Sequence, residues 1–78
     1  MNETYIVDWD LPMEKRRMFY YYLEKIKKKH EVEGSMSSQS VMIINDSDLA
    51  LEVYDLASKY GQASMYHAEL LHSNNHKE

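Results

Sequence analysis

Several features that stabilise or localise small proteins are missing from this chain of 78 residues. It has no cysteine, which excludes disulfide bonds and thiolate metal sites. No apolar run approaches the roughly 20 residues that a membrane-spanning helix needs, and the first residues lack the basic and apolar regions of a secretory signal. We therefore expect a cytoplasmic protein with no membrane partner. Because so short a chain buries only about 60% of its surface, a second copy is the expected source of further stability.

The charges are unevenly distributed along the chain. The net charge is −4, yet seven of the nine basic residues fall between Lys15 and Lys29. A local basic surface on an acidic body can still hold a phosphate backbone. The alternative is that the lysines at 25, 27, 28 and 29 only complement the C-terminal end of a helix.

The first 29 residues predict a strand followed by a helix. From 4 to 11, apolar residues at odd positions alternate with Ile6, Asp8 and Asp10, which is the period of a strand. Pro12 ends the strand because it has no N–H to donate, and it suits the first turn of a helix. Over 13–29 an apolar stripe at helical spacing is formed by Met18, Phe19, Tyr22, Leu23 and Ile26.

The second half predicts three more strands and one more helix. A strand is expected over 39–45, and its continuous apolar run at 41–44 favours a place at the centre of a sheet or at a dimer contact. A weaker strand is expected within 32–37. The polar run 45–48 offers caps for a helix over 47–60, and Gly61 is placed to close it in the left-handed conformation. The last strand is expected over 62–71.

The predicted order is βαββαβ, which is the ferredoxin-like arrangement of the α+β class: an antiparallel sheet with two helices on one face. Residues 1–72 then form a single domain and 73–78 a polar tail. The sheet face without helices must be solvated or paired with another molecule. Because tyrosine, methionine and tryptophan are plentiful on the strands, we predict a homodimer formed through the sheet.

Asp10 is the strongest candidate for chemistry. Asp8 and Asp10 point to the same face of the first strand, and Asp10 lies at its C-terminal end. Such a carboxylate can bind Mg²⁺, which typically takes one or two protein carboxylates and keeps several waters. In a two-fold dimer the two copies of Asp10 could share one ion. The alternative is a solvated strand end with a turn-forming aspartate.

A basic cluster and a serine are candidates for nucleic-acid binding. Lys15, Arg16 and Arg17 stand in the first turn of a helix, where cations oppose the macrodipole, and one reason for that placement is phosphate binding. Neutralisation by Glu14 and the upstream aspartates explains them equally well. Ser40 begins a strand whose end should lie near Asp10, where it could hold a water or a phosphate oxygen, or simply fill the start of the strand.

The histidines and tyrosines favour structural roles. The spacing of the four histidines supplies no zinc ligand set. His30 suits a helix end, His67 a strand, and the other two the polar tail. Tyr20, Tyr21 and Tyr22 could stack on bases, but consecutive helical residues face different ways. Tyr22 is expected in the core.

The stretch Ile6-Val7-Asp8-Trp9-Asp10-Leu11-Pro12, followed by Lys15-Arg16-Arg17, resembles the opening of the CRISPR-associated protein 2 family. Gln39-Ser40-Val41 resembles that family's Gln-x-Ser-Val region without its intervening residue. The resemblance implies a ferredoxin-like homodimer that acts in CRISPR spacer acquisition, or a Mg²⁺-dependent endonuclease of RNA or DNA. It implies Asp10 as catalytic residue and metal ligand. It also implies Arg16, Arg17 and Ser40 as contacts to nucleic acid, and a CRISPR integrase subunit as a partner. The chain ends soon after the fourth predicted strand, which argues against the integrase contact.

Three functions remain open from the sequence. The first is a metal-dependent nuclease with Asp10 at its centre. The second is a non-catalytic dimer that binds nucleic acid or a protein, for which the basic cluster matters and Asp10 does not. The third is a toxin-type endoribonuclease similar to the virulence-associated protein D family.

Overall fold

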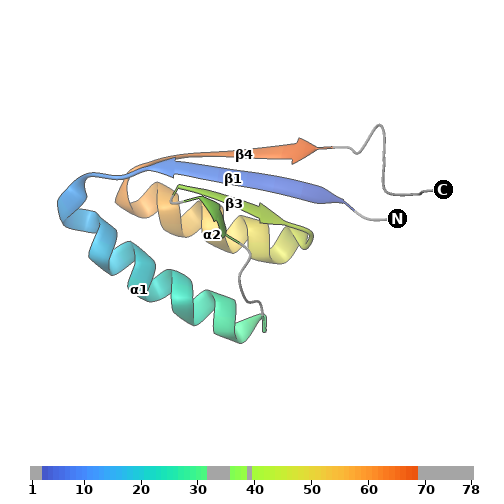
Figure 1. The fold of residues 1–78 in the computed structure, drawn as a ribbon, viewed down its shortest axis with the longest axis horizontal. Helices are drawn as coiled ribbons and strands as arrows, with labels where there is room; N and C mark the ends of the chain where they lie inside the picture. Colours follow the sequence, from blue (N-terminus) through green and yellow to red (C-terminus); the bar gives the residue numbers. More distant parts are fainter. Residues whose placement is uncertain (1–2, 32–35, 39, 69–78) are drawn as a thin grey trace.

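The computed structural model describes residues 3–31, 36–38 and 40–68. The elements follow in the order β1 (Thr4–Asp10), α1 (Met13–Lys29), β2 (Met36–Ser38), β3 (Val41–Ile44), α2 (Ser47–Tyr60) and β4 (Gln62–Ala68). The strands form one antiparallel sheet in the order β2-β3-β1-β4, and both helices lie on the same side of it (Figure 1). The protein is therefore α+β, in an arrangement compatible with the predicted ferredoxin-like fold.

Both predicted helices have the predicted bounds, and the predicted first strand runs one residue longer than β1. The predicted strand over 39–45 corresponds to the shorter β3, which has neighbours on both sides as expected. Most of the predicted second strand, the end of the last strand beyond Ala68 and the polar tail lie outside the described residues.

Strand β1 forms the centre of the fold because it pairs with both β3 and β4. Val7 lies opposite Met42 of β3 and Met65 of β4. Val7, Trp9 and Met42 are buried. Side chains alternate between the two faces of a strand, so the odd residues of β1 turn toward the helices and the even residues toward the open face of the sheet.

The core fills the layer between the sheet and the two helices. Helix α1 contributes Phe19 and Leu23, and α2 contributes a face that recurs every three or four residues. The buried residues of that face are Leu49, Ala50, Val53 and Ala57. Among the described residues the buried set is wholly apolar, so burial of hydrophobic surface stabilises this layer.

The tyrosine of α1 that packs on the core is Tyr20, and the prediction for Tyr22 is wrong. The indole Nε1 of buried Trp9 donates a hydrogen bond to the Tyr20 hydroxyl at 3.3 Å. A buried indole N–H usually finds an acceptor, which turns Tyr20 inward. Tyr22 is instead 37% exposed.

Polar contacts fix the helix ends. The Asp46 carboxylate accepts a hydrogen bond from the Asp48 N–H at 3.0 Å, which confirms the predicted cap of α2. At the other helix, Lys29 Nζ lies 2.7 Å from Glu52 Oε2 and His30 Nε2 lies 3.2 Å from Glu52 Oε1. The C-terminal end of α1 is thereby attached to α2.

Candidate functional site

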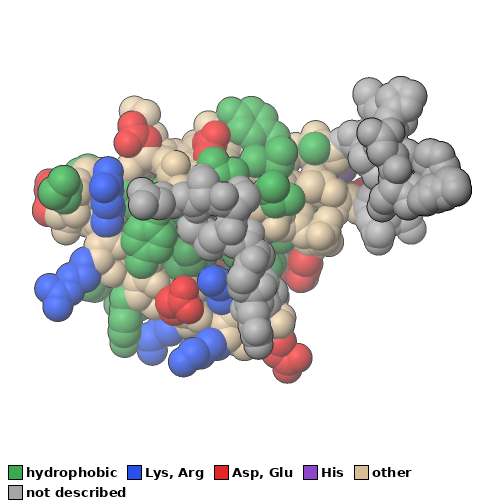
Figure 2. Space-filling model, in the orientation of Figure 1, with side chains coloured by type: hydrophobic (Ala, Val, Ile, Leu, Met, Phe, Trp, Pro, Cys, Tyr) green, Lys and Arg blue, Asp and Glu red, His purple; other side chains and the backbone are tan. Residues whose placement is uncertain are grey.

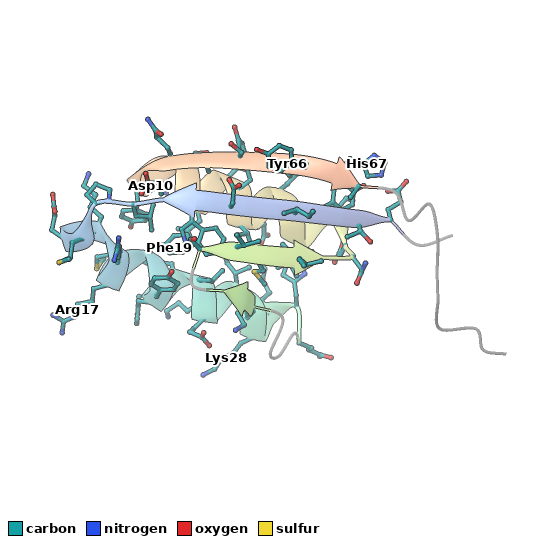
Figure 3. The ribbon with its side chains drawn as sticks, turned by 45° about the horizontal axis from the view of Figure 1, so that its top comes forward. Asp10, Arg17, Phe19, Lys28, Tyr66 and His67 are labelled. Atoms are coloured by element: carbon teal, nitrogen blue, oxygen red, sulfur yellow. The ribbon has the colours of Figure 1, made fainter. Side chains whose placement is uncertain are left out.

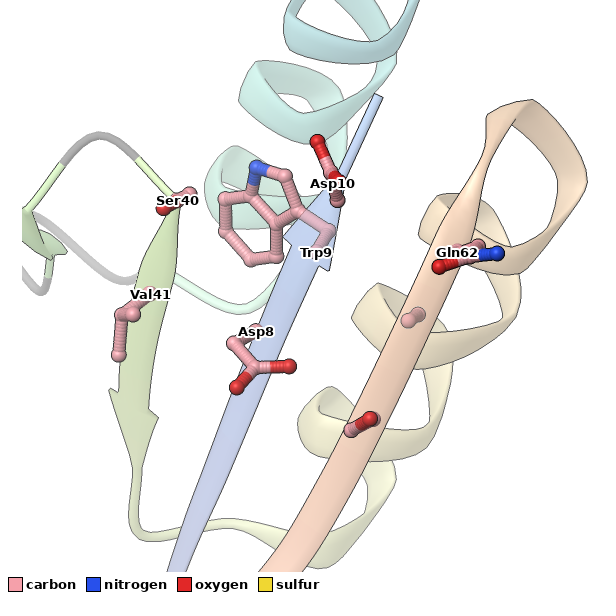
Figure 4. Close-up of a pocket in the computed structure, with 8 residues that line it drawn as sticks. Asp8, Trp9, Asp10, Ser40, Val41 and Gln62 are labelled. Atoms are coloured by element: carbon pink, nitrogen blue, oxygen red, sulfur yellow. The ribbon is translucent and has the colours of Figure 1, made fainter. Parts of the chain in front are cut away.

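A shallow hollow of about 280 Å³ opens on the sheet where β1 ends and β4 begins (Figure 4). We call it the acidic hollow, because two carboxylates are its only charged lining residues. It is lined by Asp8, Trp9, Asp10, Ser40, Val41, Gln62, Ala63 and Ser64. Three neighbouring strands thus meet at one polar cavity.

The alternation of β1 explains why both carboxylates reach the acidic hollow. Asp8 lies opposite Val41 of β3 and Ser64 of β4, and Asp10 lies opposite Gln62. Trp9 stands between them and points the other way. Its ring contacts Phe19 with the centroids 4.9 Å apart. Anchoring of this large ring in the core leaves Asp8 and Asp10 on the open face, and the prediction that they share one face is confirmed.

A tight backbone contact fixes the end of β1 beside Asp10. A Cβ atom added at Gly61 would lie 2.6 Å from the carbonyl oxygen of Asp10 and 2.7 Å from Leu11 Cδ2. Only glycine lets the end of α2 approach the strand so closely. The expected left-handed conformation of Gly61 is wrong, because its φ of −174° is extended. The glycine is needed for space rather than for its backbone angles.

Ser40 lies at the acidic hollow, on the side formed by β3. The N–H of Trp9 donates to the Ser40 carbonyl oxygen at 3.1 Å, which extends the pairing of β1 and β3 to the end of β1. Ser40 therefore lines the same cavity as Asp8 and Asp10, and the predicted proximity of Ser40 and Asp10 is confirmed.

The basic cluster lies at the same end of the molecule but outside the acidic hollow. Lys15, Arg16 and Arg17 are exposed on the first turns of α1. Arg16 Nε donates to the carbonyl oxygen of Leu11 at 3.3 Å, which holds its side chain against the turn after Asp10. Arg17 points away from the sheet (Figure 3). The structure thus separates the carboxylates from the basic cluster, whereas it brings Ser40 to the same cavity as the carboxylates.

The donor set of the acidic hollow fits a hard cation bound through few protein ligands. Two carboxylates, two serine hydroxyls and the amide oxygen of Gln62 are all oxygen donors, which Mg²⁺ prefers, and Mg²⁺ typically uses only one or two protein carboxylates. The described residues contain no cluster of three or more aspartate, glutamate or histidine residues suited to a metal ion. Any cation here would complete its coordination with water or with phosphate oxygens of a substrate.

Two lining residues of the acidic hollow escaped the sequence interpretation. Gln62 and Ser64 begin β4, more than 50 residues after β1. No local signal marks them, because only the register of β4 against β1 brings them to the two aspartates.

The open face of the sheet continues from the acidic hollow into an apolar row. Ile6 lies directly opposite Ile43 on one side and Tyr66 on the other. Ile43 is 44% exposed and Tyr66 53% exposed. The strand predicted over 39–45, which corresponds to β3, is therefore covered by the helices on one face, while Ile43 on its other face is exposed.

The described histidines have structural partners. His30 bridges Glu52 of α2 and Asp46, the residue that caps α2, with Nδ1 3.7 Å from the Asp46 carboxylate. His67 stacks on Tyr5 with ring centroids 5.1 Å apart. The Tyr5 hydroxyl donates to Glu3, which raises the pKa of Tyr5 above its ordinary value. Neither histidine reaches the acidic hollow, and the other two lie outside the described residues.

Comparison with protein-family models, curated proteins and solved structures gives no match for this chain. Within the part of the chain that the structure describes, neither helix is long and apolar enough to cross a membrane.

Proposed function

We propose that this protein is a Mg²⁺-dependent endonuclease that acts as a homodimer, the activity that its resemblance to the CRISPR-associated protein 2 family implies. The observation that carries the proposal is the meeting of Asp8, Asp10 and Ser40 at one open cavity on the end of the central strand. The exposed Asp10 and half-buried Asp8 carboxylates are accessible to a cation and to a bulky substrate.

Asp10 and Asp8 would hold the cation, and Ser40 and Gln62 would bind water or phosphate oxygens beside it. A bound Mg²⁺ would lower the pKa of a coordinated water and neutralise charge that develops on the phosphate. The protein would contribute by fixing the positions of the groups that bind the cation. Trp9 and Gly61 fix the strand end, so the two carboxylates are held in place before substrate arrives.

The basic start of α1 would guide the phosphate backbone toward this end of the molecule. Lys15, Arg16 and Arg17 lie on the turns that directly follow Asp10. Two carboxylates repel a phosphate polymer unless a cation neutralises them, so nearby basic residues favour the encounter.

The apolar row on the open face supports the homodimer. Ile6, Ile43 and Tyr66 are in direct register across three strands, and a second copy would remove them from water. In a two-fold contact the same residues of both copies are buried. Because the acidic hollow adjoins this row, the contact would also bring the carboxylates of both copies toward one axis, where a shared cation offsets their repulsion.

Cleavage of labelled RNA and DNA oligonucleotides with Mg²⁺ or Mn²⁺ tests the proposal. We expect the wild type to cleave one of the two, and Asp10→Asn to lose at least about 100-fold in rate, as for loss of a group that binds the reacting centre. Asp55→Asn is the matched control, because Asp55 is exposed on α2 and outside the acidic hollow. Equal rates for wild type and Asp10→Asn would exclude the proposed site.

Sedimentation velocity tests the dimer separately. We expect Ile43→Asp to shift the protein to monomer at concentrations where the wild type and Leu51→Asp are dimeric. Leu51 is a similarly exposed apolar residue on α2. A wild type that remains monomeric with and without Mg²⁺ would overturn this part of the proposal.

A non-catalytic nucleic-acid-binding dimer is the second candidate. The observation that favours it is that the described residues offer two carboxylates to a metal rather than a set of three. Binding without cleavage at any Mg²⁺ or Mn²⁺ concentration would select this candidate. A role in CRISPR spacer acquisition is compatible with either activity.

A further inference from the structure

The outer face of α1 is a second exposed surface with a composition of its own. Phe19 and Leu23 turn toward the core. With 3.6 residues per turn, the opposite side of the helix carries exposed residues that we call the outer face of α1: Arg17, Met18, Tyr21, Tyr22, Glu24, Lys25 and Lys28. Lys and Arg side chains gather over this helix in Figure 2, and Arg17 and Lys28 project from it away from the sheet in Figure 3.

The tyrosine rings of this face are ordered against each other and against a cation. Tyr21 and Tyr22 pack edge to face, with centroids 5.1 Å apart and an interplanar angle of 75°. Lys25 Nζ lies 5.0 Å from the centroid of Tyr21. Tyr21 is 55% exposed despite these contacts. Two rings are thus presented to solvent beside positive charges.

Between Arg17 and Lys28 the cations of this face outnumber its one carboxylate, that of Glu24. Glu24, whose side chain is 63% exposed, also lies on this face, and it pairs with the partly buried Lys27 at 3.4 Å. Among the described residues no carboxylate forms an ion pair with Arg17, Lys25 or Lys28, and Lys25 Nζ lies over the Tyr21 ring. Arg17 and Lys28 are 11 residues apart, which corresponds to about 16 Å along the helix axis. The outer face is therefore a positive surface long enough for several nucleotides.

Charge complementarity and the exposed rings together favour a single-stranded nucleic acid. Single strands are bound by positive surfaces that neutralise phosphates and by aromatic rings on which bases stack. A duplex hides its bases and would leave Tyr21 and Tyr22 unused. An anionic membrane would need an apolar helix face to insert, but the apolar side of α1 is already buried in the core.

We propose that the outer face of α1 binds a single-stranded segment of nucleic acid, with Tyr21 and Tyr22 stacking on bases and Arg17, Lys25 and Lys28 contacting phosphates. The inference deepens the proposed function by naming single strands as the ligand, and it rests on that function only in taking nucleic acid as the substrate. The surface lies on the opposite layer from the acidic hollow and needs no metal. A strand bound there could reach the hollow around the basic start of α1.

Fluorescence anisotropy with a labelled oligonucleotide of roughly 12 nucleotides, in EDTA, tests the inference without cleavage. We expect the single strand to bind at least about 10-fold more tightly than the matching duplex. The double variant Tyr21→Ala/Tyr22→Ala should lose about 10-fold or more in affinity, because stacking contributes strongly per base. Tyr21→Phe/Tyr22→Phe should retain affinity, since it keeps both rings.

A salt titration of the same binding separates the phosphate contacts. Each phosphate contact to a single strand contributes about 0.7 to the slope of log affinity against log salt. Lys25→Gln/Lys28→Gln should therefore reduce the slope by about 1.4, while Lys59→Gln, an exposed lysine of α2, should leave it unchanged.

Three results would overturn the inference: unchanged affinity of the alanine double variant, tighter binding of the duplex, or tighter binding of vesicles that contain anionic lipid. Because EDTA removes the metal, a wild type that binds here but never cleaves would reject the proposed nuclease and keep this surface.

Discussion

The open face of the sheet and the outer face of α1 lie on opposite layers of the molecule and differ in charge. The first carries Asp8 and Asp10 beside an apolar row. The second carries exposed cations around two tyrosine rings. A net charge of −4 conceals this separation. If the protein binds nucleic acid as proposed, a phosphate polymer meets cations at α1 and carboxylates at the acidic hollow, where a divalent cation would offset the repulsion.

The open face of the sheet and the outer face of α1 rest on the same part of the core. Trp9, Phe19 and Tyr20 form a continuous aromatic contact between β1 and α1. That contact lies beneath both surfaces. A change in it should affect both, whereas a change at the strand end should affect the acidic hollow alone.

The largest expected effect is on the shared core. Phe19 is fully buried and touches Trp9, so Phe19→Ala should destabilise the fold by about 3–5 kcal/mol. Urea denaturation followed by circular dichroism measures this, and both binding by α1 and cleavage should fail together at ordinary temperatures. A loss below about 1 kcal/mol would mean that the two layers do not share this core.

A smaller effect is expected at Gly61, and it should divide the two surfaces. The added methyl group of Gly61→Ala would meet the Asp10 carbonyl oxygen at 2.6 Å, so the backbone must shift at a cost of about 1–3 kcal/mol. We expect cleavage to fall while single-strand binding by α1 persists. Ala57→Gly, which removes a methyl group one turn earlier, is a control for destabilisation without the clash. Equal cleavage by Gly61→Ala and the wild type would remove the role assigned to this contact.

The smallest effect concerns the attachment of α1 to α2. The hydrogen bond from Lys29 lowers the pKa of the Glu52 carboxyl below its ordinary value, and His30 adds to this effect. Because the pKa is lower in the folded state, ionised Glu52 stabilises the fold above about pH 4.5, and this contribution is lost as the pH falls through the folded value. The pair is partly exposed, so its contribution should be less than about 1 kcal/mol.

Urea midpoints at two pH values measure this contribution. The wild type should exceed Glu52→Gln near pH 7, and the difference should disappear by about pH 3. Asp55→Asn, at an exposed carboxylate without a partner among the described residues, should show no comparable change. A difference in urea midpoint between the wild type and Glu52→Gln that grows toward low pH would contradict the expected pH dependence.

The elements themselves could be predicted because local signals mark them. Pro12 ends β1 and begins α1, and Asp46 caps α2 with its own side chain. The two-residue period of β1 also predicted that Asp8 and Asp10 share a face. These features depend on neighbouring residues, which the sequence displays directly.

The rest depends on contacts between distant residues. Helical spacing placed Tyr22 on the apolar stripe. The structure packs Tyr20 on the core instead, and that depends on the hydrogen bond from Trp9, a residue of another element. Gln62 and Ser64 reach the acidic hollow only through the register of β4 against β1. The space needed at Gly61 depends on how closely α2 approaches the end of β1. None of these is encoded in a local pattern.

The most direct test of the division between the two surfaces is a Mn²⁺ titration of ¹⁵N-labelled protein observed by NMR. A paramagnetic ion broadens the amide signals close to it. We predict broadening first at Asp8, Asp10, Ser40 and Gln62, its loss in Asp10→Asn, and sharp signals for Tyr21 and Lys25. Broadening centred elsewhere, or none at millimolar Mn²⁺, would contradict the assignment of the acidic hollow as the cation site.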